Sequence, residues 1–300
     1  MCARVNRSRE TYVSGAGIAL LLFVYKLFGQ SACRCLTAVV VFLSYPFLRS
    51  ARRASAAFRK QWELFTSTRC VSGLTHLRTF AYTLADRLAC RAGLFPFQLV
   101  QVCTPETVES LTALYRQRKG AFCIVSHLGC FDMLRVFFDS SREGMAGEIH
   151  VFMDTRATQA FVRYQKRYGG AQLEDMVHSV ETLGPALSME MAGKVDAGAM
   201  LVMAGDRIWR DSADANYEFS FLGRKARFPR GCFRWAAAMK VPVYSLCLAE
   251  NGGRYDLHVE CLSADGDTQA KSLAAAYVAS LENLCCRYPA NWFNFYDFWR

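Results

Sequence analysis

The sequence predicts an α/β fold in which a mixed central sheet is flanked by helices and preceded by an N-terminal apolar helical membrane anchor. From residue 121 onward, short apolar runs typical of strands alternate with helical stretches, which is the pattern of an α/β sheet. Two apolar runs bounded by basic residues lie ahead of them. The chain has 300 residues, 52% of them hydrophobic, and can bury a substantial core. We therefore expect a membrane-anchoring segment over residues 1–54 and an α/β domain over residues 55–300.

The N-terminal segment carries most of the net positive charge. Residues 1–60 contain ten basic residues and one acidic residue, whereas the rest of the chain holds 26 and 25. Because these basic residues flank apolar stretches, they favour an anionic membrane surface over nucleic acid as the partner. The two apolar runs, residues 12–25 and 35–48, are shorter than the ~20 residues that a straight membrane-crossing helix needs. They predict a monotopic hairpin or a single slanted anchor.

Two other interpretations of these runs stay open. Arg4, Arg7 and Arg9 precede an apolar stretch, as in a cleaved signal peptide, although no small-residue cleavage site follows at the right distance. Apolar runs of about 10–14 residues also occur in ordinary core helices. The flanking arginines favour the membrane interpretation.

The domain itself is expected to begin with helices and continue with strands. Residues 55–91 suit helices broken near Ser72 and Gly73, and Thr104 and Pro105 mark the start of a helix that runs to about Lys119. The expected strands are residues 121–126, 149–153, 199–203, 218–221, 241–248 and 255–261. The last fourteen residues are rich in aromatic side chains, which either seal the core or sit at a lipid interface.

A histidine and an aspartate stand out at the end of the first of these strands. Residues 121–125 form the expected strand, residues 126–129 the turn, and Asp132 begins the next helix, so His127 lies at the carboxyl end of a strand, where α/β sheets bind ligands. The short interval can bring the Asp132 carboxylate back to the His127 imidazole. Such a pair is suited to general-base activation of a hydroxyl or an amine. Gly129 would let backbone and substrate approach closely at the turn.

With their surroundings, these residues resemble the lysophospholipid acyltransferase superfamily, and within it the bacterial lipid A lauroyl/myristoyl acyltransferases and related predicted lipid acyltransferases. The hallmark of that superfamily is an H-x4-D/E pair. The resemblance extends over nearly the whole chain. Besides the apolar basic N-terminus and residues 126–132, it includes residues 151–156, 203–207, 221–231 and 287–293. Phosphoglycerolipid members of the superfamily usually carry the motif F-P-E-G. This chain has Arg230 at the position of the glutamate, and the lipid A branch also departs from that glutamate.

The resemblance implies a direct acyl transfer. His127, oriented by Asp132, would deprotonate a hydroxyl or amine of a lipid acceptor, which attacks the thioester of acyl carrier protein or coenzyme A. Arg207, Arg227 and Arg230 are candidate anion clamps, because guanidinium groups suit phosphates and carboxylates. Asp206 is a candidate partner that orients Arg207. We expect membrane lipids and the acyl thioester as partners, no bound cofactor, and a place at the cytoplasmic face of the inner membrane.

Several other functions are disfavoured by missing motifs. The chain has no G-x-S-x-G elbow, no phosphate-binding loop and no dinucleotide fingerprint after a strand. The thirteen cysteines lack paired spacing, and Asp175 with His178 makes only two ligands, so we predict reduced thiols and no metal. The four histidines other than His127 are expected to be structural or exposed. The remaining rival is a membrane-associated lipid-binding or scaffold protein that has the acyltransferase fold but no activity.

Overall fold

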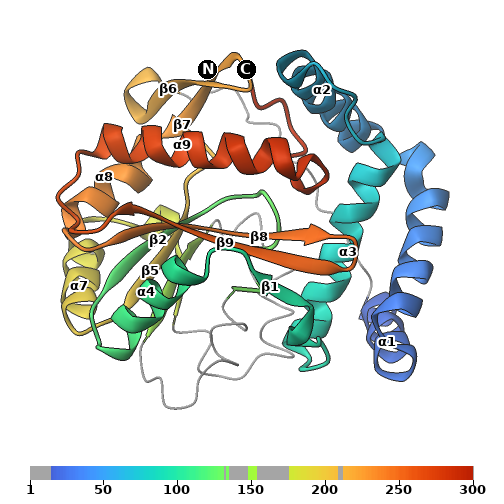
Figure 1. The fold of residues 1–300 in the computed structure, drawn as a ribbon, viewed down its shortest axis with the longest axis horizontal. Helices are drawn as coiled ribbons and strands as arrows, with labels where there is room; N and C mark the ends of the chain where they lie inside the picture. Colours follow the sequence, from blue (N-terminus) through green and yellow to red (C-terminus); the bar gives the residue numbers. More distant parts are fainter. Residues whose placement is uncertain (1–14, 132, 135–147, 154–175, 209–211, 300) are drawn as a thin grey trace.

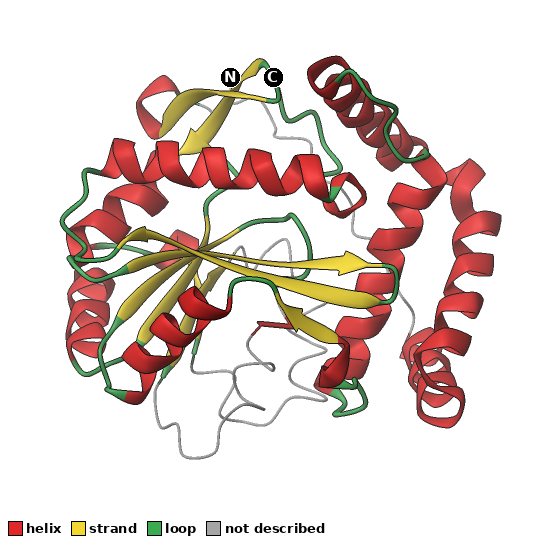
Figure 2. Cartoon of the chain, in the orientation of Figure 1, coloured by secondary structure: helices red, strands yellow, loops and turns green. Residues whose placement is uncertain are grey.

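A seven-stranded sheet forms the centre of the molecule. The computed structural model describes residues 15–131, 133–134, 148–153, 176–208 and 212–299. The strand order is β1-β9-β8-β2-β5-β3-β4, and all neighbours are parallel except β8 and β9. A separate antiparallel pair is formed by β6 and β7. The strands are β1 (Val100–Val102), β2 (Ala121–Val125), β3 (Ile149–Met153), β4 (Val177–Ser179), β5 (Met200–Ala204), β6 (Asn216–Phe221), β7 (Arg224–Pro229), β8 (Val243–Asn251) and β9 (Arg254–Ser263). The predicted mixed sheet flanked by helices is confirmed (Figures 1 and 2).

Helices cover the sheet and one of its ends. Figure 1 shows α8 and α9 on one face, α4 on the other, and α1, α2 and α3 together beside the sheet. The helices are α1 (Gly15–Ser44), α2 (Arg49–Thr66), α3 (Gly73–Arg91), α4 (Pro105–Arg116), α7 (Pro185–Asp196), α8 (Arg230–Met239) and α9 (Ala270–Arg287). Short 3-10 turns lie at Tyr45–Phe47, Phe97–Leu99, Val180–Thr182, Ala213–Ala215 and Pro289–Asn291.

The central strand β2 is buried along its whole length. Phe122 and Ile124 pack into the apolar core under α8 and α9, while Ala121, Cys123 and Val125 pack into the core on the opposite face. A strand covered on both faces reads as a continuous apolar run, which is why residues 121–125 are uniformly apolar. Burial of this kind holds the end of β2, and therefore the residues that follow it, in a fixed position.

The start of α4 differs in one detail from its predicted cap. Pro105 is the first helical residue, as expected, and Thr104 occupies the N-cap position. The Thr104 hydroxyl does not cap the helix, however, because it accepts a hydrogen bond from the backbone nitrogen of Val259 at 2.8 Å. Thr104 therefore ties the start of α4 to β9.

The long apolar helix α1 is broken in the middle and docked on the domain. The stretch Gly17–Phe47 is long and apolar enough to cross a membrane by length and composition, a test that a signal sequence or a core helix also passes. Gly29 has φ 75° and ψ −172°, which splits the helix into two arms. Arg34 joins it to the domain through ion pairs with Asp86 at 2.8 Å and Glu250 at 2.6 Å. The boundary predicted between residues 54 and 55 lies inside α2.

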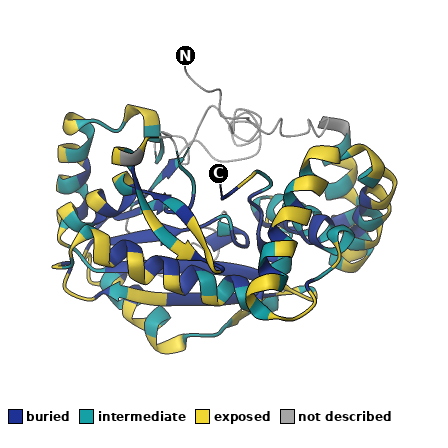
Figure 3. Cartoon of the chain, turned by 90° about the horizontal axis from the view of Figure 1, so that it is seen from above, coloured by how far each residue is buried: buried dark blue, intermediate teal, exposed yellow. Residues whose placement is uncertain are grey.

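The outer face of the N-terminal helices is apolar and exposed. Tyr25, Cys33 and Val41 of α1 are buried against the domain. Large apolar side chains on the other faces are more than half exposed. They are Leu20, Phe23, Leu27, Phe28, Val39, Val40, Phe42, Leu43 and Phe47. Figure 3 shows many exposed residues on this group of helices. Water-exposed apolar surface of this extent marks an interaction site.

Candidate active site

His127 lies just beyond the end of β2, at the edge of the sheet where the parallel strands end. β2 pairs in parallel with β5 in a register that places Val125 beside Ala204. The residues two positions further along each chain therefore meet, and these are His127 and Asp206. The His127 side chain remains 19% exposed, so a substrate can reach it.

The Asp206 carboxylate holds His127 by two hydrogen bonds. Its Oδ1 lies 2.8 Å from the imidazole Nδ1, and its Oδ2 accepts from the His127 backbone nitrogen at 2.7 Å. An ionised carboxylate only accepts hydrogen bonds, so Nδ1 carries the proton and Nε2 of the neutral ring keeps its lone pair. No residue in the described part of the chain hydrogen-bonds to Nε2.

Asp206 is fully buried and remains ionised because its partners compensate for its burial. Burial by itself would raise the pKa of this carboxyl. The nearby His127 imidazole, the two hydrogen bonds from His127 and a third from Asn294 outweigh burial and lower the pKa below its ordinary value. The Asn294 side-chain amide donates to Oδ2 at 2.8 Å. The site therefore contains an oriented imidazole next to a fixed negative charge.

This partner differs from the one predicted for His127. Asp132 lies outside the described residues, so its role stays a prediction. Asp206 was expected to orient Arg207, but it bonds to His127, and the Nε of Arg207 donates to the Asn294 side-chain oxygen at 3.1 Å. Arg207 also lies over the Tyr296 ring, 5.9 Å from its centroid. Arg207 is thus joined to Asp206 through Asn294.

The C-terminal segment completes the site, a role that its aromatic composition did not reveal. Phe293 donates its backbone N–H to the carbonyl of His127 at 2.9 Å, and Leu128 pairs with Trp292. The Asn291 side chain bonds to both the N–H and the C=O of Glu250 at the end of β8. Trp292 and its aromatic neighbours are buried, so of the two predicted roles for this segment, core packing is the one found.

Gly129 is required by packing at the turn. Its φ is +77°, its N–H donates to the carbonyl of Asn291 at 2.9 Å, and a Cβ at this position would overlap the carbonyl oxygen of Leu248. The N–H of Cys130 is bonded to the same Leu248 oxygen. These two amides are therefore occupied by backbone carbonyls and are not free to donate to a substrate.

We expect Gly129→Ala to destabilise the protein and displace His127. A non-glycine residue in this backbone conformation costs ~1–3 kcal/mol, and the overlap with Leu248 adds to that cost. The urea concentration at the midpoint of unfolding should fall, and the rate of the expected acyl transfer should fall with it. Gly193→Ala is the matched control, because this helical glycine has nothing within 4 Å of a built Cβ. Equal midpoints for both variants would contradict the packing role.

Two of the predicted arginines, Arg230 and Arg227, lie on α8 and on the β6–β7 hairpin. Arg230, the first residue of α8, donates from Nη1 to the backbone oxygen of Asp214 at 3.1 Å and lies over the Tyr217 ring, 4.9 Å from its centroid. Arg227 is half-buried on β7, opposite Glu218 of β6. The structure thus joins Arg207 to Asp206 through Asn294, whereas Arg230 contacts Asp214 and Tyr217.

His76 connects the C-terminal segment to the N-terminal helices through two hydrogen bonds. This residue of α3 is fully buried, with Nε2 2.6 Å from the carbonyl oxygen of Trp292 and Nδ1 2.9 Å from the Ser55 hydroxyl. The first bond needs a proton on Nε2, so in the neutral ring Nδ1 accepts from Ser55. Burial is the main reason that the pKa of His76 is lowered to about 4.

Acid is expected to unfold the protein partly through His76. Its folded pKa, about 4, lies below the ordinary value of 6.5, so the unfolded chain takes up the proton first. Stability from this residue is complete above ~pH 6.5 and is lost as the pH falls toward 4. Between pH 7.5 and 5 the unfolding free energy should drop by ~2 kcal/mol more in the wild type than in His76→Gln, measured by urea titration in detergent. If the unfolding free energies of the two proteins fell equally with pH, this role of His76 would be contradicted.

The arrangement is that of a general base held by a buried carboxylate. Asp206 fixes the tautomer and orientation of His127 and stabilises the imidazolium that forms when Nε2 takes a proton. The described residues near His127 include no serine or cysteine that bonds to Nε2, so the proton is expected to come from a substrate.

No protein-family model matches the chain, and no curated protein matches it significantly.

Proposed function

We propose that the protein is a membrane-associated acyltransferase. It moves a fatty acyl group from an acyl thioester, carried by acyl carrier protein or coenzyme A, to a hydroxyl or an amine of a lipid acceptor. The observation that supports this most is the Nδ1 bond between His127 and Asp206, which leaves Nε2 available as a base at the ligand-binding edge of the sheet. The resemblance of residues 126–132 to the H-x4-D/E acyltransferases supports acyl transfer as the proposed reaction class.

The proposed reaction needs no covalent enzyme intermediate. His127 Nε2 takes the proton from the acceptor O–H or N–H as the acceptor atom attacks the thioester carbonyl carbon. The tetrahedral intermediate collapses when the C–S bond breaks, and the imidazolium returns its proton to the departing thiolate. Asp206 stays ionised throughout and stabilises the imidazolium. Arg207, held by Asn294 beside Asp206, is the cation proposed to bind a phosphate or a carboxylate of the donor or the acceptor.

The N-terminal helices are proposed to hold this site at a membrane surface, at the cytoplasmic face of the inner membrane. Because Gly29 interrupts α1, each arm is ~22 Å long, less than the ~30 Å apolar thickness of a bilayer. Its buried face and the Arg34 ion pairs keep α1 on the domain, which favours a helix lying in the interface over one that crosses it. Arg49, Arg52 and Arg53 of α2 are exposed and suit anionic head groups.

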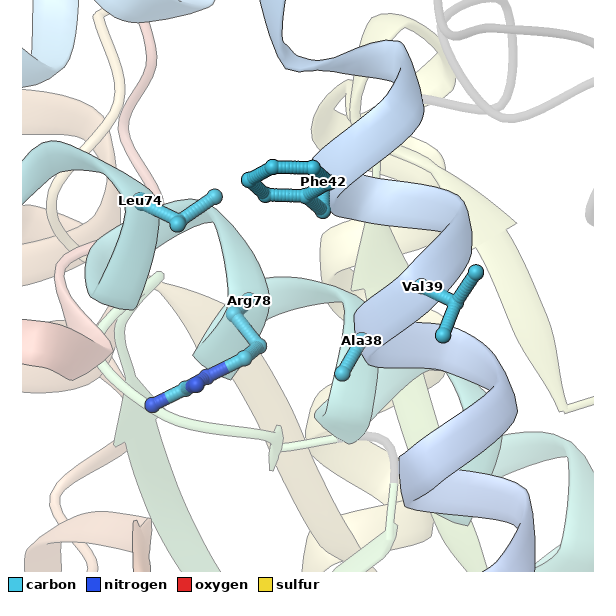
Figure 4. Close-up of a pocket in the computed structure, with 5 residues that line it drawn as sticks. All are labelled: Ala38, Val39, Phe42, Leu74 and Arg78. Carbon is cyan, nitrogen blue, oxygen red and sulfur yellow. The ribbon is translucent and has the colours of Figure 1, made fainter.

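A small apolar pocket opens between α1 and α3 on this side of the molecule. Its volume is about 270 Å³, and its lining consists of Ala38, Val39, Phe42, Leu74 and Arg78. In Figure 4, Phe42 and Leu74 point toward one another across the gap, and the Arg78 guanidinium lies at one side. Hydrocarbon against the apolar walls and an anionic group beside Arg78 would suit a membrane lipid.

The anchoring proposal predicts that exposed phenylalanines on α1 hold the protein on membranes. Phe23, Phe28 and Phe42 are 58%, 68% and 65% exposed, so replacing all three with serine should leave the fold intact. Each phenylalanine fully buried in lipid contributes ~1.5–3 kcal/mol, and we expect most of the triple variant in the soluble fraction after centrifugation. Met189→Ser, at an exposed apolar residue on α7, is the control and should stay with membranes. Equal fractionation of both would contradict the proposal.

Mass spectrometry of lipids tests the proposed function in cells. Extracts from cells with and without the gene should differ by a lipid that is heavier by one fatty acyl group. Reintroducing the wild-type gene should restore that lipid, and reintroducing His127→Ala should not. Identical lipid profiles in all strains would instead favour a lipid-binding protein with an inactive site.

A further inference from the structure

Three metal-ligand side chains that are far apart in the sequence meet at one edge of the sheet. β1 pairs in parallel with β9, with Gln101 beside Asp256 and Val102 beside Leu257. The pairing continues one residue further, since Cys103 donates its N–H to the carbonyl of Leu257 at 2.9 Å. Cys103 is thereby brought beside His258, two residues after Asp256. One donor atom from each of Cys103, Asp256 and His258 lies within 4.8 Å of the others.

The donor set matches the preference of zinc. Thiolate sulfur, imidazole nitrogen and carboxylate oxygen are the ligands that bind Zn²⁺, with bonds of ~2.0–2.3 Å in a tetrahedron. That geometry puts ligand atoms ~3.3–3.8 Å apart, so the three side chains need to close in by about 1 Å. The carboxylate and the thiolate together supply two negative charges, which neutralise the ion. Three protein ligands leave one position for water or a further donor.

Outer partners already orient two of the three side chains. The Tyr288 hydroxyl donates to Asp256 Oδ2 at 2.8 Å and lies 2.9 Å from His258 Nε2. Asn251 Nδ2 donates to the same carboxylate oxygen at 2.9 Å. Histidines and carboxylates that bind a metal are usually held by outer hydrogen bonds of this kind. Asp256 and His258 are buried and Cys103 is half-buried, so the cluster is formed within the fold and open on its Cys103 side.

We propose that Cys103, Asp256 and His258 form a zinc site that fastens the edge strand β1 to β9. Binding releases the proton of the Cys103 thiol, and the thiolate bonds to the metal. β1 has only three residues, so a metal bridge to β9 would add to the few backbone bonds that hold it. The site lies apart from His127, and its occupancy is measured without any assay of acyl transfer. The sequence predicted no metal, because its cysteines lack paired spacing and Asp175 with His178 makes only two ligands.

Cobalt binding tests the site directly. The full-length protein, purified in detergent, is reduced, stripped with a chelator and titrated with Co²⁺, then with Zn²⁺. We expect a band from thiolate-to-cobalt charge transfer that saturates at one ion per protein and disappears on addition of Zn²⁺. Cys103→Ser should abolish the band, and Cys35→Ser, which removes an exposed cysteine on α1, should leave it unchanged. No band in the wild type, or an equal band in Cys103→Ser, would overturn the proposal.

Two further variants keep the test independent of folding. His258→Gln should weaken Co²⁺ binding at least tenfold while the circular dichroism spectrum stays that of the wild type. Arg287 lies over the Tyr288 ring, 5.2 Å from its centroid, and its charge acts on both Cys103 and His258. Removing that exposed positive charge in Arg287→Gln should therefore tighten Co²⁺ binding. Unchanged affinity in both variants would place the metal elsewhere on the protein.

Discussion

Replacing His127 with alanine is expected to lower the rate of acyl transfer by ~10²–10⁴-fold, the usual contribution of a positioned general base. The side chain is partly exposed, and among the described residues it hydrogen-bonds only to Asp206, so its removal should leave the fold intact. The loss should appear in kcat, because the imidazole acts on the proton that moves in the transition state. Rates are measured with purified protein, an acyl thioester and lipid vesicles.

A second histidine variant serves as the control for His127→Ala. His178 is half-buried on β4, where its Nε2 lies 2.9 Å from His150 Nδ1, away from the His127 site. His178→Ala should retain a rate within a few-fold of the wild type. If His127→Ala were as active as His178→Ala, the imidazole of His127 would not be the base.

Asp206→Asn is expected to lower activity by a comparable amount. In catalytic triads, the same change leaves the geometry in place and reduces kcat by ~10⁴ because the histidine adopts the wrong tautomer. Here the amide would present an N–H to the His127 groups that now donate to Asp206. Asn294 would lose its acceptor as well, so the melting temperature is measured in parallel to separate a loss of stability from a loss of catalysis.

Comparing Asp206→Asn with Asp132→Asn decides which carboxylate orients His127. If Asp206 has this role, its variant should lose far more activity than the Asp132 variant does. The opposite order would show that the neighbour predicted from the sequence is the partner that matters. Equal losses with unchanged melting temperatures would mean that both carboxylates act on the imidazole.

Much of the sheet could be predicted from the sequence, because its long strands are buried. The expected strand at residues 149–153 coincides with β3, and the other five expected strands overlap β2, β5, β6, β8 and β9. β1 and β4 were not predicted; each has three residues, too few for a recognisable pattern. β7 was also missed, because three of its six residues are basic and it stands on the small hairpin outside the main sheet.

The candidate site was predictable only where its chemistry is local. His127 follows a recognisable strand, so its place at the sheet edge could be derived from its neighbours. Asp206 reaches it through the pairing of β2 with β5, and that register is not visible in the sequence. Asn294 comes from the C-terminal segment, whose aromatic composition indicates packing and not a polar contact with Asp206. Long-range contacts of this kind require the three-dimensional structure.

The apolar N-terminus was recognised by composition, but its attachment to the domain was not. Lys26 and Arg34 lie between the two apolar runs of the sequence. In the structure Arg34 is buried to 13% exposure between Asp86 and Glu250, which lie far along the chain. A charge placed in this way joins the helix to the domain, a role that requires partners and cannot be inferred from hydropathy.

The most direct test of acyl transfer by His127 is a balance of products. Purified protein is mixed with an acyl thioester and lipid vesicles, and the released thiol and the acylated lipid are measured in the same sample. The proposed reaction predicts one acylated lipid for each thiol released in the wild type, and neither product above background in His127→Ala. Thiol release without an acylated lipid, or undiminished lipid acylation by His127→Ala, would contradict it.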